Sequence, residues 1–145
     1  VYAFAVDLSI PLRVPGGSME AGEAPEEALH REILEESGLD WLQLVRKIGI
    51  HRYYKAYIDA QVERHDFLLY APATILDSWA YRVTGSGEDA DEIFLYRWLP
   101  AHDLHKISEE LRTFLNPTDL PELFNWRLEM GDWRGEPEKS QNLRR

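Results

Sequence analysis

The stretch from Pro25 to Ser37 constrains the fold more than any other part of the chain, because its sequence marks both the ends and the faces of a helix. Proline suits the first turn of a helix, and alanine, leucine and glutamate dominate the interior that follows. Gly38 stands where a left-handed glycine ends a helix. Leu29 and Ile33 lie on one flank of the predicted helix, where they would pack on a sheet. We therefore expect a helix over 25–37 with a sheet beside it.

The same helix carries a concentration of negative charge. Between Gly16 and Asp40, seven glutamates accompany one arginine and one histidine. Glu32, Glu35 and Glu36 lie within an arc of roughly 100° on a helix, where like charges repel and weaken the isolated helix. A solvated acidic face would account for them, and the helix alone favours that interpretation. A hard cation such as Mg²⁺ is the other explanation, because its ligands are carboxylate and carbonyl oxygens.

Charge and composition narrow the choice of partners. The 26 Asp and Glu outnumber the 16 Lys and Arg, and the net charge of −10 repels long nucleic acids and anionic membrane surfaces. An anionic small molecule stays open as a ligand if a divalent cation bridges it to the carboxylates. The 145-residue chain has no cysteine, no apolar run of about 20 residues and no visible signal peptide. We therefore expect no membrane span, no disulfide and a cytoplasmic location.

The remaining segments predict a sheet covered by helices. Strands are expected at 1–6, in a hairpin of 42–54 and 60–73, and at 93–100. A second helix is expected over 101–115, where apolar residues have helical spacing, and a short third one within 120–130. The order predicts an α/β fold with a mixed sheet between helices, one domain over 1–133, and a polar, flexible tail over 134–145. The aromatic residues expected in the core or against helices are Trp79, Tyr81, Trp98, Trp126 and Trp133.

The spacing of individual residues around the first helix is more specific than its charge. Gly16 and Gly17 form a glycine pair ahead of the helix. From Gly17 onward the chain reads Gly, five residues, Glu, seven residues, Arg-Glu, an aliphatic residue, one residue, Glu-Glu, one residue, Gly and an aliphatic residue. This pattern resembles the signature of the Nudix hydrolase family at every fixed position. The matching residues are Gly17, Glu23, Arg31, Glu32, Ile33, Glu35, Glu36, Gly38 and Leu39. The order of the predicted elements also resembles the α/β/α sandwich of that family.

The resemblance implies a hydrolase that uses Mg²⁺ or Mn²⁺ to cleave the pyrophosphate linkage of a nucleoside diphosphate joined to another moiety. The implied substrates are nucleoside triphosphates, nucleotide sugars, ADP-ribose and dinucleoside polyphosphates. Metal ions would neutralise the diphosphate and lower the pKa of a bound water. The alternative is a non-catalytic Nudix-fold module that binds a nucleotide as a sensor. The complete set of signature carboxylates argues against it, because a binder would not need them all.

The resemblance also assigns roles to single residues. The expected metal ligands are the carbonyl of Gly16 and the carboxylates of Glu23, Glu32, Glu35 and Glu36, with Glu23 acting through water or a second metal ion. The expected catalytic residues are Glu32 as the first candidate for the general base, Arg31 as the group that orients it, and Glu35.

Candidates outside the signature are fewer. Glu88 and Glu92 lie in the acidic loop 84–92, which could supply the general base but reads equally well as a solvated loop. Glu92 is the candidate for a catalytic role, and Glu88 is also a candidate for binding substrate. Tyr57 and Tyr54 could stack on a nucleotide base, although a structural role is the ordinary explanation in a tyrosine-rich strand pair.

Two further expectations concern the whole protein. Members of this family are often homodimers, and the resemblance implies a possible homodimer here as well. The family usually has a longer segment before the glycine pair, and the printed sequence does not begin with Met. We therefore expect residues of the native protein to be missing ahead of Val1 and between Asp7 and Leu12.

Overall fold

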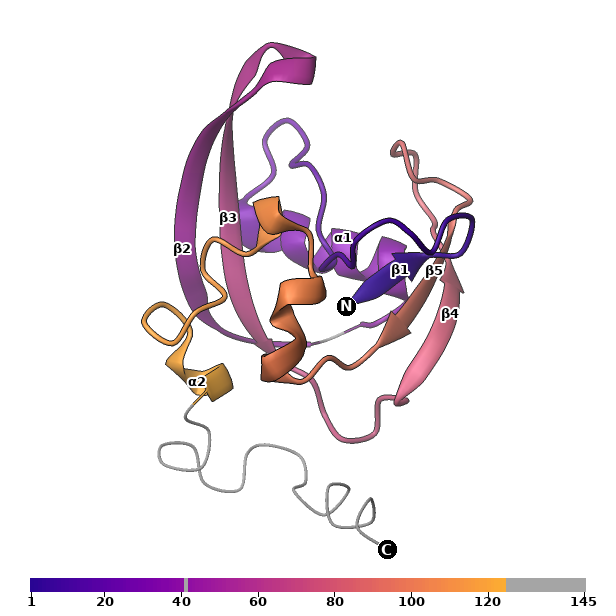
Figure 1. Ribbon diagram of the computed structural model, residues 1–145. Helices are drawn as coiled ribbons and strands as arrows, with labels where there is room; N and C mark the ends of the chain where they lie inside the picture. Colours follow the sequence, from indigo (N-terminus) through magenta and orange to yellow (C-terminus); the bar gives the residue numbers. More distant parts are fainter. Residues whose placement is uncertain (41, 125–145) are drawn as a thin grey trace, which may run out of the picture. The chain divides into compact units, whose positions relative to one another are not determined.

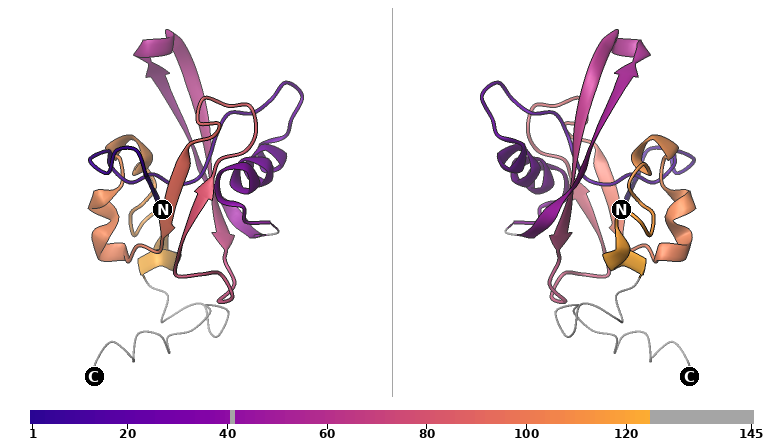
Figure 2. Two further views of the ribbon diagram at one scale, coloured as in Figure 1. Left: turned by 90° about the vertical axis from the view of Figure 1, so that its right-hand side faces the viewer. Right: turned by 90° about the vertical axis from the view of Figure 1, so that its left-hand side faces the viewer.

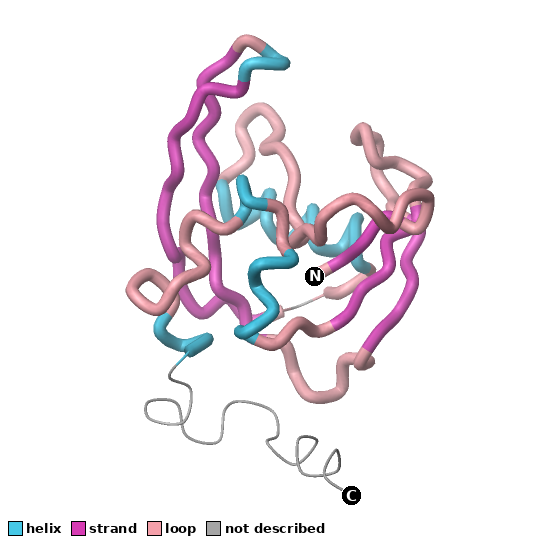
Figure 3. Tube along the Cα trace, in the orientation of Figure 1, coloured by secondary structure: helices cyan, strands magenta, loops and turns pink. Residues whose placement is uncertain are grey.

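The computed structural model describes residues 1–40 and 42–124 (Figure 1). They form two compact units, one comprising residues 1–40 and 77–113 and the other residues 42–76 and 114–124. Figure 3 marks their helices, strands and loops. No helix within these described ranges is long and apolar enough to cross a membrane.

The first unit is built on an antiparallel sheet of three strands in the order β1-β5-β4. The strands are β1 (Tyr2–Phe4), β4 (Ser78–Arg82) and β5 (Ile93–Arg97). Tyr96 lies at the centre of this sheet, because it pairs with Tyr2 on one side and with Trp79 on the other. The buried side chains of the sheet form an aromatic core of Tyr2, Val83, Phe94 and Tyr96.

Helix α1 (Pro25–Ser37) packs on β4 and β5, and the prediction of this helix is confirmed at both ends. At its start, the amide of Ala24 donates to the carboxylate of Glu27 at 2.9 Å. At its end, Gly38 adopts the left-handed conformation with φ 73° and donates its amide to the carbonyl of Leu34. The side chain of Ile33 in α1 is buried, as its position on the apolar flank of the helix predicted. Figure 2 shows α1 and the segment 101–111 on opposite sides of this sheet.

The prediction of a second long helix over 101–115 is wrong. Two short 3₁₀ helices stand there, η2 (Ala101–Lys106) and η3 (Glu109–Leu111). Between them, Ile107 is extended and pairs with Leu12 in an isolated parallel bridge. The amide of Leu12 donates to the carbonyl of Lys106 at 3.0 Å, and the amide of Ser108 donates to the carbonyl of Leu12 at 2.8 Å. Pairing with a distant strand segment therefore takes the backbone groups that a continuous helix would need.

Other strands also differ from expectation. The first strand spans Tyr2–Phe4 and not residues 1–6, since the amide of Asp7 turns back to the carbonyl of Phe4 at 3.3 Å. Strand β4 was not predicted. Its residue Trp79 was expected in the core or against a helix, and Trp79 does pack against the aromatic core. Among the described residues, the named strands pair in antiparallel fashion, and the parallel pairing is limited to the isolated bridge of Leu12 with Ile107, so the expected mixed sheet is not formed.

The second unit is the predicted hairpin with a short helix beside it. Strands β2 (Gln43–Lys55) and β3 (Ala60–Tyr70) are antiparallel, and the 3₁₀ helix η1 (Ala56–Ile58) closes their tip. Helix α2 (Pro121–Phe124) is tied to β2 by Arg46, which binds both oxygens of Glu122, at 2.6 and 2.8 Å. The ring of Phe114 lies against Gly49 of β2, where an added Cβ would come within 2.6 Å of it.

The other aromatic residues expected in the core differ in their burial. Tyr81 is partly buried against the aromatic core, as predicted, whereas Trp98 follows β5 and is 52% exposed, so its expected burial is wrong. Trp126, Trp133 and the polar tail 134–145 lie outside the described residues. The single domain over 1–133 stays a prediction.

Candidate functional site

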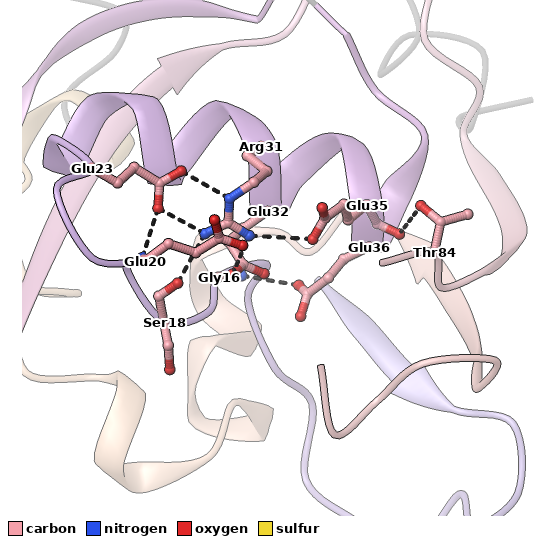
Figure 4. A network of polar contacts seen from close by, with 9 residues as sticks. All are labelled: Gly16, Ser18, Glu20, Glu23, Arg31, Glu32, Glu35, Glu36 and Thr84. Carbon is pink, nitrogen blue, oxygen red and sulfur yellow. Dashed lines mark hydrogen bonds and ion pairs between the residues drawn. The ribbon is translucent and has the colours of Figure 1, made fainter. Parts of the chain in front are cut away.

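Arg31 of α1 is the centre of a carboxylate cluster (Figure 4). Its Nε and Nη2 donate to the two oxygens of Glu23, at 2.8 and 2.9 Å. Its Nη1 donates to Oε1 of Glu32 at 2.8 Å and to Oε2 of Glu35 at 3.2 Å. Its Nη2 also donates to the carbonyl of Ser18 at 2.9 Å. One guanidinium thus joins the loop before the helix to three carboxylates.

Hydrogen bonds within the cluster favour the charged forms of Arg31 and Glu23. Hydrogen bonds from Arg31 and then from the amide of Glu20 lower the pKa of Glu23 to about 2. The hydrogen bonds that Arg31 makes to Glu23, followed by those to Glu32, raise the pKa of Arg31. The side chains of Arg31 and Glu23 are 24% and 14% exposed, so the cluster lies at the surface without being fully hydrated. The loop that contains Glu20 and Glu23 is therefore attached to the helix through charge-assisted hydrogen bonds.

Glu36 is in a different environment from the other carboxylates of α1. It is 5% exposed, and its Oε2 accepts a hydrogen bond from the amide of Gly16 at 3.0 Å. Burial is the main cause that raises the pKa of Glu36 to about 7. The bond from Gly16 opposes this shift, while the negative charges of Glu32 and Asp89 add to it. A buried carboxylate beside two other acids favours either a proton or a cation.

Two glycines allow the backbone to approach this cluster. A Cβ built on Gly17 would lie 2.1 Å from Cδ of Glu32, so any side chain there would displace that carboxylate. Gly85, in the loop after β4, has φ 91°, and a Cβ there would lie 2.7 Å from Oε2 of Glu35. The glycine pair of the signature and the loop after β4 therefore both lie against the acidic face of α1.

The last turn of α1 is held from outside the helix. The carbonyl of Glu35 accepts from the amide of Thr84 at 2.8 Å and from its hydroxyl at 3.3 Å. The carbonyl of Glu36 accepts from the Tyr96 hydroxyl at 3.0 Å, and that of Ser37 accepts from Nε1 of Trp79 at 3.0 Å. Three successive carbonyls at the helix end therefore accept hydrogen bonds from Thr84, from Tyr96 of β5 and from Trp79 of β4.

The donor set at Glu36 suits a hard divalent cation. Among residues 1–40 and 42–124, no three His, Asp or Glu side chains are already gathered as a metal site, because Arg31 draws the other carboxylates toward itself. However, Arg31 engages one oxygen each of Glu32 and Glu35. The last turn of the helix holds no basic residue, so the negative end of the helix dipole also favours a cation there. The residues present therefore fit a divalent cation at Glu36.

The structure brings together one part of the predicted site. Gly16, Glu23, Arg31, Glu32, Glu35 and Glu36 all lie in the cluster just described. For Gly16 the contact runs through its amide, although its carbonyl was the predicted ligand. Glu88 is exposed and Glu92 is partly buried in the loop before β5.

The two tyrosines predicted to bind substrate belong to the other unit. Tyr54 lies in the last part of β2 and donates its hydroxyl to Asp59. Tyr57 lies in η1, is 77% exposed and has the ammonium of Lys55 over its ring. Their role in substrate binding, like the catalytic role of Glu92 and the binding role of Glu88, stays a prediction.

Several residues at the site were not predicted to belong to it, although Trp79 was expected in the core or against a helix. Asp89 is the acid of the loop 84–92 whose charge raises the pKa of Glu36. Thr84, Trp79 and Tyr96 bind the end of the helix. The loop 84–92 was predicted to supply an acid, but Asp89 was not among the candidates. No short-range signal marks the other three, since they are joined to α1 only by the folding of distant segments.

One comparison with known proteins identifies a family. The model of the NUDIX domain family matches residues 8–118, which include the whole carboxylate cluster. Searches of curated proteins and of solved structures find no match. The family match covers more than half of the 145-residue chain. The chain therefore belongs to the Nudix hydrolase family.

Proposed function

We propose that this protein is a metal-dependent pyrophosphohydrolase. Its substrate is a nucleoside diphosphate linked to another moiety, as in nucleoside triphosphates, nucleotide sugars, ADP-ribose and dinucleoside polyphosphates. The observation that carries the proposal is the buried carboxylate of Glu36 beside Glu32, in a last helix turn that holds no basic residue. Such an arrangement destabilises the protein unless a cation or a proton occupies it, and a diphosphate needs the cation.

The cation would be held by Glu36, by the oxygen of Glu35 that Arg31 does not bind, and by the carbonyl of Gly16. Glu23 would contribute through water. When bound, a Mg²⁺ or Mn²⁺ ion supplies positive charge against the diphosphate and lowers the pKa of a coordinated water.

The side chains of the protein have separate tasks in the reaction. The oxygen of water attacks one phosphorus, the bond from that phosphorus to the bridging oxygen breaks, and the bridging oxygen leaves with the second phosphoryl group. Glu32 takes the proton of the water as general base. Arg31 holds Glu32 through one oxygen at 2.8 Å and so leaves the other available for that proton. By binding Glu23 and Glu35 as well, Arg31 keeps the three carboxylates at fixed spacing.

The test is phosphate release from a panel of these substrate classes with Mg²⁺ or Mn²⁺, coupled to a pyrophosphatase or phosphatase. Wild type is compared with Glu36→Gln and with Glu26→Gln, which makes the same chemical change in the exposed first turn of the same helix. We expect turnover by wild type and Glu26→Gln and a loss of at least about a hundredfold in Glu36→Gln, because a metal ligand is lost.

The panel also separates the alternatives. Equal turnover by wild type and Glu36→Gln would overturn the assignment of Glu36. Silence across the panel, with nucleotide binding that needs the metal ion, would instead support the non-catalytic sensor module. Hydrolysis in ¹⁸O-labelled water, followed by mass spectrometry of both products, shows which phosphorus is attacked.

A further inference from the structure

The end of α1 is fixed by contacts that are independent of the carboxylate cluster. The last carbonyls of an α-helix have no amide partner within the helix. Here Gly38 satisfies Leu34, and side chains or backbone of the β4–β5 region satisfy the next three carbonyls. These donors bond to backbone carbonyls of the helix and not to the carboxylates of Glu35 and Glu36.

The donor to Glu36 cannot move freely. Tyr96 is 4% exposed, and its ring stacks on Trp79 with centroids 4.8 Å apart and planes 9° from parallel. The ring of Tyr2 lies 5.4 Å away on its other side. Trp79 in turn donates to the carbonyl of Ser37. The two rings therefore form one rigid support whose two donors bind two consecutive carbonyls of the helix.

This support acts on the carboxylate through the backbone. The carbonyl and the side chain of Glu36 share one Cα, so a bond that fixes the carbonyl also fixes the direction in which Cβ leaves the helix. The carboxylate then meets the amide of Gly16 at 3.0 Å. We propose that Tyr96 is a positioning residue for the metal-binding carboxylate of Glu36, and that Trp79 supports it. This inference rests on the proposed function, because the ligand for which Glu36 is positioned is the divalent cation.

The experiment measures Mn²⁺ binding by electron paramagnetic resonance on the intact chain without substrate. Tyr96→Phe keeps the stacked ring and removes only the hydroxyl. Tyr81→Phe is the matched control, since it removes a hydroxyl from the neighbouring strand β4, where the Tyr81 ring packs near Gly38. We expect the Mn²⁺ dissociation constant to rise about tenfold in Tyr96→Phe, the lower range for groups that orient metal ligands, and to stay near the wild-type value in Tyr81→Phe.

A merely structural role is distinguished by two further readouts. The activity of Tyr96→Phe should recover as the Mn²⁺ concentration is raised, because the variant has lost affinity for Mn²⁺. Phe4→Leu loosens the same aromatic core, in which Phe4 contacts Phe94 edge-on at 5.0 Å, without removing a donor to the helix. If Phe4→Leu weakens Mn²⁺ binding as much as Tyr96→Phe does, general loosening accounts for the effect and the inference fails. If Tyr96→Phe does not fold, Trp79→Phe, which lacks the bond to Ser37 and should also bind Mn²⁺ more weakly, replaces it.

The outcomes also separate this inference from the proposed function. If wild type binds Mn²⁺, Glu36→Gln does not, and Tyr96→Phe binds as wild type does, only the positioning role is overturned. If wild type and Glu36→Gln bind Mn²⁺ equally or not at all, the metal site at Glu36 is wrong and the inference falls with it.

Discussion

Arg31 binds both carboxylate oxygens of Glu23, at 2.8 and 2.9 Å, across eight positions of sequence. The planar guanidinium matches the two oxygens of a carboxylate, whereas the ammonium of lysine acts as a point charge. The same group reaches two more carboxylates of α1 and the carbonyl of Ser18. Arg31 therefore sets the spacing of Glu23, Glu32 and Glu35.

Arg31→Lys should lower kcat about 10- to 100-fold, in the range seen when a group that orients metal ligands is lost. Lysine keeps the charge but cannot hold Glu23 with two bonds while it also contacts Glu32. Steady-state kinetics at saturating Mg²⁺ are compared with those of Arg52→Lys. Arg52 is an arginine of β2 whose ion pair with Glu63 is largely exposed. Equal activity of the two variants would show that the charge of Arg31 is sufficient.

Gly17→Ala should reduce activity without unfolding the protein. The new Cβ would lie 2.1 Å from Cδ of Glu32, and the flexible end of that side chain would move away. Glu32 would then lose its place beside Arg31. Gly87→Ala is the control, because nothing lies within 4 Å of a Cβ at Gly87. Thermal melts and turnover are measured on both variants, and unchanged turnover in Gly17→Ala would contradict the placement of Glu32.

Glu36 should make the metal-free protein less stable as pH rises. Its pKa in the folded state is about 7, above its usual value of 4.5, so the folded state binds more protons than the unfolded state between these values. Stability from this group is complete below pH 4.5 and is lost as pH rises through about 7. The loss is about 3 kcal/mol, since one unit of pKa corresponds to about 1.4 kcal/mol.

The measurement is urea unfolding in EDTA at several pH values, with wild type and Glu36→Gln side by side. The difference between the two free energies of unfolding should change over this range, because glutamine does not titrate. Other groups, such as Glu23, contribute equally to both proteins and cancel. A difference that stays constant with pH would show that folding leaves the pKa of Glu36 unchanged.

Asp89→Asn should lower the pKa of Glu36 and reduce kcat. The charge of Asp89 raises that pKa in the folded protein, which places this acid close to the cluster. Glu88→Gln is the comparison, because Glu88 is its exposed neighbour in the same loop. An effect of about tenfold or more on kcat in Asp89→Asn alone would identify Asp89 as the acid that acts from this loop. A larger effect in Glu88→Gln would support the sequence-based candidate.

Arg46→Met should destabilise the second unit and leave Mn²⁺ binding unchanged. Arg46 joins β2 to α2 by two bonds to Glu122 and one to the carbonyl of Asp119 at 2.9 Å. Its side chain is 35% exposed, so the expected cost is about 1 kcal/mol. Denaturant unfolding and Mn²⁺ titration of the same sample check both parts. A change in Mn²⁺ affinity would contradict the assignment of the metal site to α1.

Local sequence signals were sufficient for α1 and for the shared face of Glu32, Glu35 and Glu36, whereas the family signature assigned Gly16, Glu23 and Arg31 to the site. Proline, glycine and a 3.6-residue period act over a few positions, and these short-range effects determine where the helix begins, where it ends and which residues share a face. The β2–β3 hairpin was predicted for the same reason, since its strands are neighbours in sequence. The family signature added the chemistry expected of Glu32, Glu35 and Glu36.

Tertiary structure alone decided the rest. The spacing over 101–115 is helical, but pairing of Ile107 with Leu12 gave an extended backbone there, because the pairing satisfies groups that the helix would have bonded internally. Likewise, the carbonyl of Glu36 meets a hydroxyl 60 positions away on Tyr96. The sequence determines a helix and its acidic face by local conformational preference. The direction in which that face holds its carboxylates depends on hydrogen bonds and packing between segments that only folding brings together.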